Sequence, residues 1–158
     1  MTVATRPRTT GAHRSGDGTV RRCSIVVDST PAAARCARRF AETTVDFLDT
    51  RVDPHDLALL ISEIVANAVH LDSGSVEVSL SPVDHRLRVE VRDHGEGMPE
   101  VLDPGADEVS GRGLLIVDRV ADRWGIDQFL PGKIVWFELA EPSAPSTEGS
   151  GSGRASAG

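Results

Sequence analysis

The sequence predicts an α+β fold, a two-layer sandwich in which three helices lie on one face of a mixed, mostly antiparallel sheet. Two observations lead to this class. Short segments that alternate apolar and polar side chains with a period of two follow one another in pairs, as half-buried strands joined in hairpins do. Longer segments with helix start signals or apolar helical periodicity stand before and between these pairs. Helices are therefore expected to cover one side of the sheet.

The first half of the chain is expected to hold one strand and two helices. Residues 23–27 are a short apolar run suited to a strand. Residues 28–31, Asp-Ser-Thr-Pro, combine capping side chains with a proline, so a helix should start there and run to about Leu48. Asp-Pro at 53–54 repeats this signal before 57–69, a run so apolar that the second helix is expected to be buried nearly all round.

A hairpin and a third helix are expected next. Residues 76–80 and 87–91 each alternate apolar with polar side chains, and 81–85, Ser-Pro-Val-Asp-His, should connect them. After a stretch rich in Gly, Pro and acidic residues, the segment from Gly113 to Arg123 is predicted to be helical.

A second hairpin closes the predicted fold. Residues 124–129 and 134–139 have strand composition, and Pro131 and Gly132 between them are typical turn residues. These two strands should complete the sheet against which the three helices pack.

Residues 22–140 are expected to form the folded domain, because both ends of the chain have hardly any large apolar side chains. Residues 1–21 contain mainly Arg, Thr and Gly, and residues 141–158 are rich in Gly, Ser and Pro. Neither segment can bury enough surface to offset the entropy lost on ordering it. The first is predicted to be a disordered arm and the second a disordered tail.

The distribution of charge argues against a nucleic-acid-binding domain. The chain carries −7 in total, whereas residues 23–140 carry −10 because the arm is basic. Binding to nucleic acid needs clustered basic residues instead. No apolar run approaches the ~18 residues of a membrane span, and no signal-peptide block is visible, so a cytoplasmic protein is expected. Cys23 and Cys36 lack metal-binding spacing and are expected to be free and buried.

Glu63 and Asn67 interrupt the apolar second helix. They are spaced i to i+4 and therefore project from one face, in a stripe whose other members are small or polar. A solvated helix edge would explain them. However, a carboxylate and an amide among aliphatic side chains are costly to bury without partners, which favours a cavity, water or an ion beside them. Their oxygen atoms are ligands of the kind that Mg²⁺ prefers.

Asp93, Gly95, Gly97 and Met98 belong to a second motif, Asp-His-Gly-Glu-Gly-Met, which follows directly on a predicted strand. The alternate glycines let the backbone approach a flat ligand with no Cβ in the way. A buried Asp at a strand end can accept a hydrogen bond from an exocyclic amine, which would select adenine. An ordinary Asp/Gly turn is the other interpretation.

Gly111, Arg112, Gly113 and Leu114 form a third motif at the start of the third helix. Glycines before a helix leave its first N–H groups free to meet an anion, and the helix dipole attracts phosphate. A flexible hinge followed by a helix cap is the alternative. The motif is not a P-loop, because no GxxxxGK[ST] pattern occurs.

Together and in this order, the three motifs resemble those of the GHKL family of ATPases and kinases, which unites DNA gyrase, the Hsp90 chaperone, histidine kinases and MutL. The N box, ExxxNA, matches Glu63, Asn67 and Ala68; the first glycine box, DxGxG, begins at Asp93; and the second, GxGL, begins at Gly111. Within the family, the chain is most similar to the small anti-sigma-factor serine kinases of bacteria, especially the single-domain members of actinobacteria. The resemblance covers residues 22–140 and implies the Bergerat-type ATP-binding fold.

The resemblance implies a role for each motif. Asp93 would bind the adenine amine, and the glycine box with Gly95, Gly97 and Met98 would give the base room. Asn67 would bind Mg²⁺, and Glu63 would be the general base. The backbone of Gly111, Gly113 and Leu114, with Arg112, would hold the phosphates of ATP. Residues 98–110 would form a lid.

The implied partners are proteins. The phosphoryl acceptor in these kinases is a serine of an anti-anti-sigma protein of the STAS fold, and the kinase also sequesters a sigma factor. A homodimer is possible, and neither a membrane nor direct nucleic-acid contact is implied.

A departure from the family pattern motivates a second hypothesis. In the family, a basic residue often stands four positions after the Asn of the N box, whereas this chain has Leu71 there and has Asp72 where a glycine is usual. A nucleotide-responsive binding switch without kinase turnover is therefore the alternative function. A histidine-kinase catalytic fragment is disfavoured, because no dimerisation helix with a phospho-accepting His is recognised and the 13 residues between the glycine boxes are few for that class. DNA binding through the basic arm is a fourth hypothesis.

Overall fold

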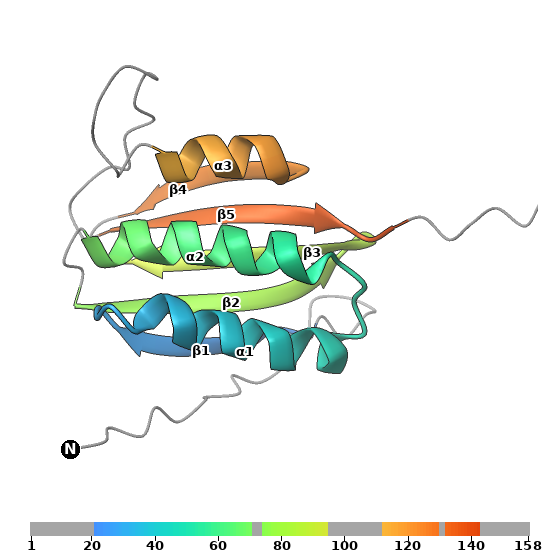
Figure 1. The fold of residues 1–158 in the computed structure, drawn as a ribbon, viewed down its shortest axis with the longest axis horizontal. Coiled ribbons are helices and arrows are strands. Elements are labelled where there is room, and N and C mark those ends of the chain that lie inside the picture. Colours follow the sequence, from blue (N-terminus) through green and yellow to red (C-terminus); the bar gives the residue numbers. More distant parts are fainter. Residues whose placement is uncertain (1–20, 71–73, 95–111, 130–131, 143–158) are drawn as a thin grey trace, which may run out of the picture.

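The chain folds into the two predicted layers, which Figure 1 shows with the helices in front of the sheet. The computed structural model describes residues 21–70, 74–94, 112–129 and 132–142. The sheet contains five strands: β1 (Cys23–Asp28), β2 (Ser75–Val83), β3 (Arg86–Asp93), β4 (Arg123–Phe129) and β5 (Gly132–Ala140). Their order across the sheet is β1-β2-β3-β5-β4, and each neighbouring pair is antiparallel. The α+β class is confirmed, with a fully antiparallel arrangement of the described strands.

The three helices cover one face of this sheet. They are α1 (Ala33–Leu48), α2 (Pro54–His70) and α3 (Arg112–Val120). α1 packs on β1 and β2, α2 on β2 and β3, and α3 beside β4, while α2 lies between the other two helices. Every second side chain of the central strands therefore enters the core between the layers. The largest fully buried core residues are Phe137, Leu60, Ile61, Ile64, Leu80, Leu87 and Leu114.

The two long helices begin in different ways. Asp53 caps α2 as predicted, because its Oδ1 accepts hydrogen bonds from the backbone N–H groups of His55 (2.7 Å) and Asp56 (3.2 Å). The expected side-chain cap of α1 is wrong: its N-cap is Ala32, which makes no such bond. A turn precedes α1 instead, in which the carbonyl of Thr30 accepts the N–H of Ala33.

The second and third helices also differ from the prediction. α2 is not buried all round, because Leu59 is 40% exposed and Ala66 is exposed as well. A two-layer sandwich has no third layer to cover the outer side of its helices. The third helix ends at Val120 and not at Arg123. After Val120 the chain forms hydrogen bonds with β5 instead: the N–H of Asp122 donates to the carbonyl of Glu138 (3.0 Å), and Asp122 Oδ2 accepts the N–H of Ala140 (2.7 Å).

A tight turn joins β2 to β3. The strands extend further than predicted, so that only Asp84 and His85 connect them. Both have positive φ, 44° and 59°, a conformation in which Asp and His are more common than most residues. Two left-handed residues match the twist of a two-residue hairpin.

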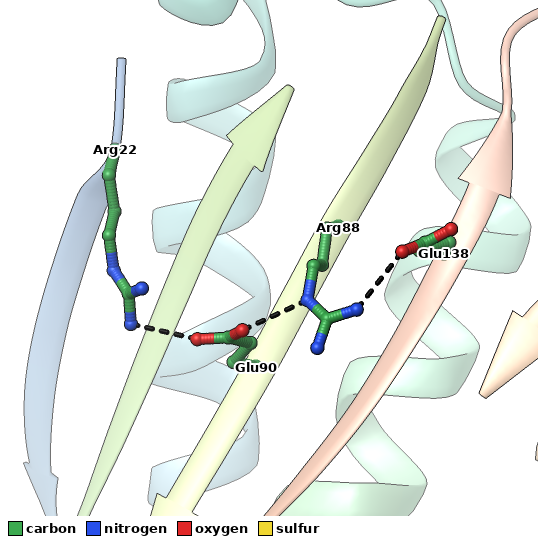
Figure 2. Close-up of polar contacts among 4 residues, drawn as sticks. All are labelled: Arg22, Arg88, Glu90 and Glu138. Atoms are coloured by element: carbon green, nitrogen blue, oxygen red, sulfur yellow. Dashed lines mark hydrogen bonds and ion pairs between the residues drawn. The ribbon is translucent and has the colours of Figure 1, made fainter. Parts of the chain in front are cut away.

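Charged side chains line the face of the sheet opposite the helices. Figure 2 shows the charge ladder, our name for Arg22, Glu90, Arg88 and Glu138, which runs across the strands. Its three ion pairs measure 2.9, 2.9 and 3.0 Å in that order. The guanidinium of Arg88 also stacks over the ring of Trp136, 4.0 Å from its centroid. Polar side chains, rather than another layer of structure, thus cover this face along the ladder.

Both cysteines are free, as expected, but only one is sheltered. Cys23 is half-buried at the start of β1, and burial raises the pKa of its thiol. Cys36 on α1 is exposed, which contradicts its predicted burial. Within the described part of the chain, no helix combines the length and apolar character needed to cross a bilayer.

Candidate functional site

The predicted site residues that the structure describes lie toward one end of the sandwich. At this end β3 finishes, β5 begins, α2 finishes and α3 begins, as Figure 1 shows on the left. The N box is on α2, Asp93 is the last residue of β3, and Gly113 is the second residue of α3. Three segments that are distant in sequence therefore contribute to one region.

The contact between α2 and α3 brings two of the motifs together. Glu63 and Asn67 are both half-buried and face the first turn of α3. A Cβ atom added at Gly113 would lie 2.8 Å from Asn67 Nδ2 and 3.2 Å from Glu63 Oε2. Only a residue without a side chain allows this approach unless Asn67 moves. The helix start thus lies directly against the carboxamide and the carboxylate.

Asp93 ends β3 on the buried, helix-covered face of the sheet. Its side chain is 1% exposed and forms an ion pair with Lys133, which is 3% exposed, at 3.0 Å between Oδ1 and Nζ. The two residues are direct cross-strand neighbours in the register of β3 and β5. On the same face of the sheet, the preceding cross-strand pair is Val91 with Val135, and both of these residues are buried. A buried charge pair thus follows an apolar pair at the end of the core.

Gly132 holds the start of β5 close to this pair. Its φ is +129°, which disfavours any residue with a side chain. A Cβ there would also overlap the backbone carbonyl oxygen of Asp93. The position of Lys133 relative to Asp93 is therefore fixed by backbone packing as well as by the ion pair.

Part of the predicted site lies outside the described residues. This applies to Gly95, Gly97, Met98 and Gly111, and also to the predicted lid, residues 98–110. Leu71 and Asp72, which motivated the switch hypothesis, lie outside as well. Arg112 is described as the first residue of α3, and Leu114, which follows Gly113, is 1% exposed and packs in the core.

The donor atoms present suit a magnesium ion that is shared with a ligand. Among the described residues, no three His, Cys, Asp or Glu side chains cluster in the way a protein-only metal site requires. Mg²⁺ is commonly bound through one or two protein oxygens, with substrate phosphates and water completing the shell. Asn67 and Glu63 offer such oxygens beside a helix N-terminus, which itself attracts phosphate. Their chemistry fits Mg²⁺ bound together with a phosphate chain.

Two features of this region were not predicted from the sequence: the buried side chain of Lys133 and the positive φ of Gly132. A usable signal for Lys133 existed, because it precedes Val135, Phe137 and Leu139 at intervals of two and so shares their buried face. Its partner could not be inferred in the same way, since Asp93 is 40 residues away and meets it only through the sheet order.

A separate cavity of about 230 Å³ lies between α1 and α2. Its lining residues are Arg38, Ala41, Glu42, Val45, Asp46, Val52, Pro54, Leu57 and Ala58. None of these is a predicted site residue, so the cavity is distinct from the region that the motifs share.

Comparison with known proteins places this arrangement in a family. Residues 52–152, more than half of the chain, match the model of the histidine kinase-, DNA gyrase B- and HSP90-like ATPases. The signal transduction histidine-protein kinase AfsQ2 of Streptomyces coelicolor is 30% identical over 103 residues, which are 65% of this chain but only 14% of that protein. The chain therefore spans a small part of the length of this relative.

The fold is shared with a solved structure as well. The crystal structure of the RsbU and RsbW domains of Rv1364c from Mycobacterium tuberculosis aligns with a TM-score of 0.57 at 20% identity, over 77% of this chain and 32% of that one. At 20% identity, this structural match shows a shared fold and nothing more. The match to the family model, in contrast, is a match of the amino-acid sequence. The chain belongs to the histidine kinase-, DNA gyrase B- and HSP90-like ATPase family, whose ATP-binding fold it adopts.

Proposed function

We propose that this chain is an ATP-dependent serine protein kinase and anti-sigma factor, which phosphorylates an anti-anti-sigma partner of the STAS fold and sequesters a sigma factor in the cytoplasm. The observation that carries the proposal is the contact of Gly113 with Glu63 and Asn67. It brings the start of α3, which suits a phosphate chain, against one carboxylate and one amide. Phosphoryl transfer needs these three kinds of group close together.

In this proposal, the described residues divide the work of binding ATP. Asp93 accepts a hydrogen bond from the 6-amino group of adenine, and the first backbone N–H groups of α3 bind phosphate oxygens. Asn67 contributes an oxygen ligand to Mg²⁺, which neutralises charge on the phosphates when it is bound. Because the charge of residues 23–140 is −10, the anion must be held by such local groups and not by the general field.

Glu63 is the proposed general base. It lies one helical turn before Asn67, and its Oε2 is the carboxylate oxygen that approaches Gly113. A base in this place can accept the proton of a serine hydroxyl as the oxygen attacks the terminal phosphate. Such proton transfer contributes roughly 10²- to 10⁴-fold to a rate, and positioning supplies most of the rest.

The test separates nucleotide binding from transfer. Glu63→Gln should bind ATP within about threefold of wild type and lose roughly 100-fold or more in transfer, because only the base is removed. Asp93→Asn should lose the nucleotide, because its amide presents an N–H where the carboxylate accepts. Glu42→Gln, at an exposed carboxylate on α1, is the matched control and should change neither quantity.

Binding is measured by displacement of a fluorescent ATP analogue, with and without EDTA. Transfer is measured by mass spectrometry as a phosphoserine on the protein that co-purifies with the chain from its native cell. Wild-type transfer by Glu63→Gln would show that the assigned base is wrong. Mg-ATP binding with no phosphoserine after long incubation would favour the binding switch without turnover.

Gly113→Ala tests the supporting observation directly. The added Cβ would lie 2.8 Å from Asn67 Nδ2, so the end of that flexible side chain must move. The fold should survive, while Mg²⁺-dependent affinity for ATP falls by about tenfold because Asn67 is displaced. Unchanged affinity, with and without EDTA, would show that this contact does not form part of the nucleotide site.

A further inference from the structure

The cavity between α1 and α2 lies at the end of the sandwich opposite the candidate nucleotide site. Its lining residues belong to α1 from Arg38 onward, to the connection after α1 and to the start of α2. These parts lie toward the right in Figure 1, whereas the site motifs lie toward the left. The cavity measures about 230 Å³, while a single water needs only ~10–15 Å³. It therefore has room for side chains of a peptide.

The lining of this cavity combines an apolar wall with an acidic rim. Leu57 is buried and Val45 is half-buried, whereas Glu42 and Asp46, one helical turn apart on α1, are exposed. Among the described residues, neither of these two carboxylates forms an ion pair. A ligand that contacts both the wall and the rim needs aliphatic groups and positive charge together.

Acidic residues also surround the cavity. Residues 42–56, which include the connection between the two helices, contain five acidic residues and one arginine and so carry −4. The basic residue of the lining, Arg38, is already held, since its Nη1 donates a hydrogen bond to Ser62 Oγ on α2 (2.9 Å). The surface therefore favours a cationic ligand.

Residues 1–20, which we call the N-terminal segment, have the matching chemistry. An arginine can lay its aliphatic stem along an apolar surface while its guanidinium binds carboxylates in a bidentate manner. The C-terminal segment, residues 143–158, contains one acid and one arginine and carries no net charge, so it is a poorer ligand for this surface. The N-terminal segment carries +2, because it contains one acid, Asp17, and three arginines, Arg6, Arg8 and Arg14.

The N-terminal segment is also tied to this end of the molecule. Arg21, which follows it, donates a hydrogen bond from Nη1 to the carbonyl oxygen of Phe47 in the last turn of α1 (3.3 Å). The Arg21 guanidinium lies 5.8 Å from the centre of the Phe47 ring. Phe47 directly follows Asp46 of the acidic rim. The segment therefore joins the folded domain close to the cavity.

We propose that the N-terminal segment binds in this chain's own cavity between α1 and α2, with arginine stems over the apolar wall and guanidinium groups on Glu42 and Asp46. The inference does not rest on the proposed function, because the cavity contains none of the nucleotide-site residues. Residues 1–20 have too few large apolar side chains to fold alone, but binding to a preformed site needs far fewer contacts.

The connecting chain is long enough for this contact. Phe47 is turned about 200° around α1 from Val45, so the segment has to cross the outer surface of the helix. A helix is roughly 10 Å wide, which about three or four extended residues span. Arg14 lies seven residues before Arg21 and is therefore within reach. A tether of this kind provides an effective concentration in the millimolar range, so that even a weak site is occupied.

The experiment locates the segment by paramagnetic NMR on the full chain. Thr10→Cys carries a nitroxide label. The native cysteines are replaced by Cys23→Ala and Cys36→Ser, so that the chain has one thiol to label, and circular dichroism verifies the fold. The methyl signals of Ala, Val and Leu are then compared before and after chemical reduction of the nitroxide.

The signals of the cavity lining should respond to the label. At about 0.05 M salt, the methyl signals of Val45 and Leu57 should lose about half of their intensity or more, because the tethered segment is mostly bound. Leu114, at the opposite end of the sandwich, should keep its signals. Salt at about 0.5 M should restore most of the lost intensity, because the rim carboxylates are exposed and therefore screened.

Charge exchange gives the sharpest test, because Glu42 and Asp46 are exposed and their substitution leaves the core intact. Glu42→Lys with Asp46→Lys should abolish the loss of signal at the lining. Replacing the three arginines of the segment by glutamate in that same chain should bring the loss back. Asp127→Lys, at an exposed carboxylate on the edge strand β4, is the matched control and should change nothing.

Four outcomes would overturn the inference. Unchanged signals at the lining would show that the segment does not bind there and that the cavity serves another ligand. Equal loss at the lining and at Leu114 would show that the segment samples the whole surface. A loss that persists with lysines at the rim would show that charge does not direct the binding. Nitroxide-labelled chains without isotope, mixed with isotope-labelled chains without nitroxide, should produce no loss; a full loss in this mixture would assign the cavity to the segment of a second copy.

Discussion

The two faces of the sheet hold charge in opposite ways. On the open face, the charge ladder reaches from solvent into a sheltered end: the side chains of Arg22, Arg88 and Glu138 are 52%, 23% and 9% exposed. On the helix-covered face, Asp93 and Lys133 form a pair that is almost fully buried. Successive side chains of β3 point alternately to these two faces of the sheet.

The difference lies in how each charge is supported. In the ladder, Glu90 contacts two arginines and Arg88 contacts two glutamates, so the loss of one member leaves its neighbours another partner or water. Burial alone would lower the pKa of Arg88, but its hydrogen bonds to Glu90 and Glu138 outweigh this and raise the pKa. The helix-face pair has little access to water that could replace a lost partner. We therefore expect it to respond far more strongly to substitution.

The largest effect is expected from breaking the buried pair. Lys133→Met should lower the free energy of unfolding by about 3–5 kcal/mol, because it leaves a buried carboxylate without its counter-charge. The double variant Asp93→Leu/Lys133→Met should recover most of this loss, since it removes both charges together. Urea unfolding followed by circular dichroism measures each value.

The same double-variant measurement can be made on the open face of the sheet. Arg88→Met with Glu138→Leu is the corresponding double variant in the ladder. Its two substitutions should show a smaller coupling energy than those of the buried pair, because Arg88 is partly exposed and both residues have further partners in the ladder or in water. If the ladder and the buried pair gave the same coupling energy, burial would not be what separates the two faces.

A smaller effect is expected from the ladder itself. Arg88→Met should cost about 1–2 kcal/mol, the sum of modest ion pairs and of the stacking on Trp136. Salt at 0.5 M should reduce this cost, because partly exposed charges are screened, and should change the cost of Lys133→Met much less. Unfolding curves at low and high salt give both quantities. Equal salt dependence of the two variants would contradict the comparison.

The smallest effect is expected in the rate of cysteine modification, a measurement that does not depend on a change in stability. It compares a half-buried thiol with an exposed one. Cys36 is exposed, whereas Cys23 is half-buried and its thiol pKa is raised by that burial. A raised pKa lowers the fraction of reactive thiolate at pH 8. Iodoacetamide should therefore modify Cys36 about tenfold faster than Cys23, as peptide mass spectrometry can follow. Raising the pH should speed up the reaction of Cys23 as its thiolate forms.

The sequence predicted the elements well because their signals are local. Alternation along 76–80 and 87–91 located the first hairpin, and Asp53 and Pro54 located the start of α2. The errors occurred where contacts with distant segments determine where an element ends. α3 ends early because Asp122 bonds to β5, and the turn at 84–85 is short because both strands pair to their ends.

For the candidate site, the sequence predicts a set of residues but not how they meet in the fold. The spacing of Glu63 and Asn67 placed them on one helix face, and the structure adds that Gly113 lies against them. The pairing of Asp93 with Lys133 depends on β5 lying beside β3, which no local pattern reveals. The roles of these residues stay predictions until binding and transfer are measured.

The turn at Asp84 and His85 has a consequence for the opposite end of the sheet. The cross-strand pairs of β2 and β3 begin at this turn, with Val83 and Arg86, and end with Val76 and Asp93. The turn therefore fixes the register of β3 against β2. Because side chains alternate, a shift of one residue would turn Asp93 outward and bring Arg92 beneath the helices. A single insertion at a turn that has no chemistry of its own would therefore exchange an acid for a base inside the molecule.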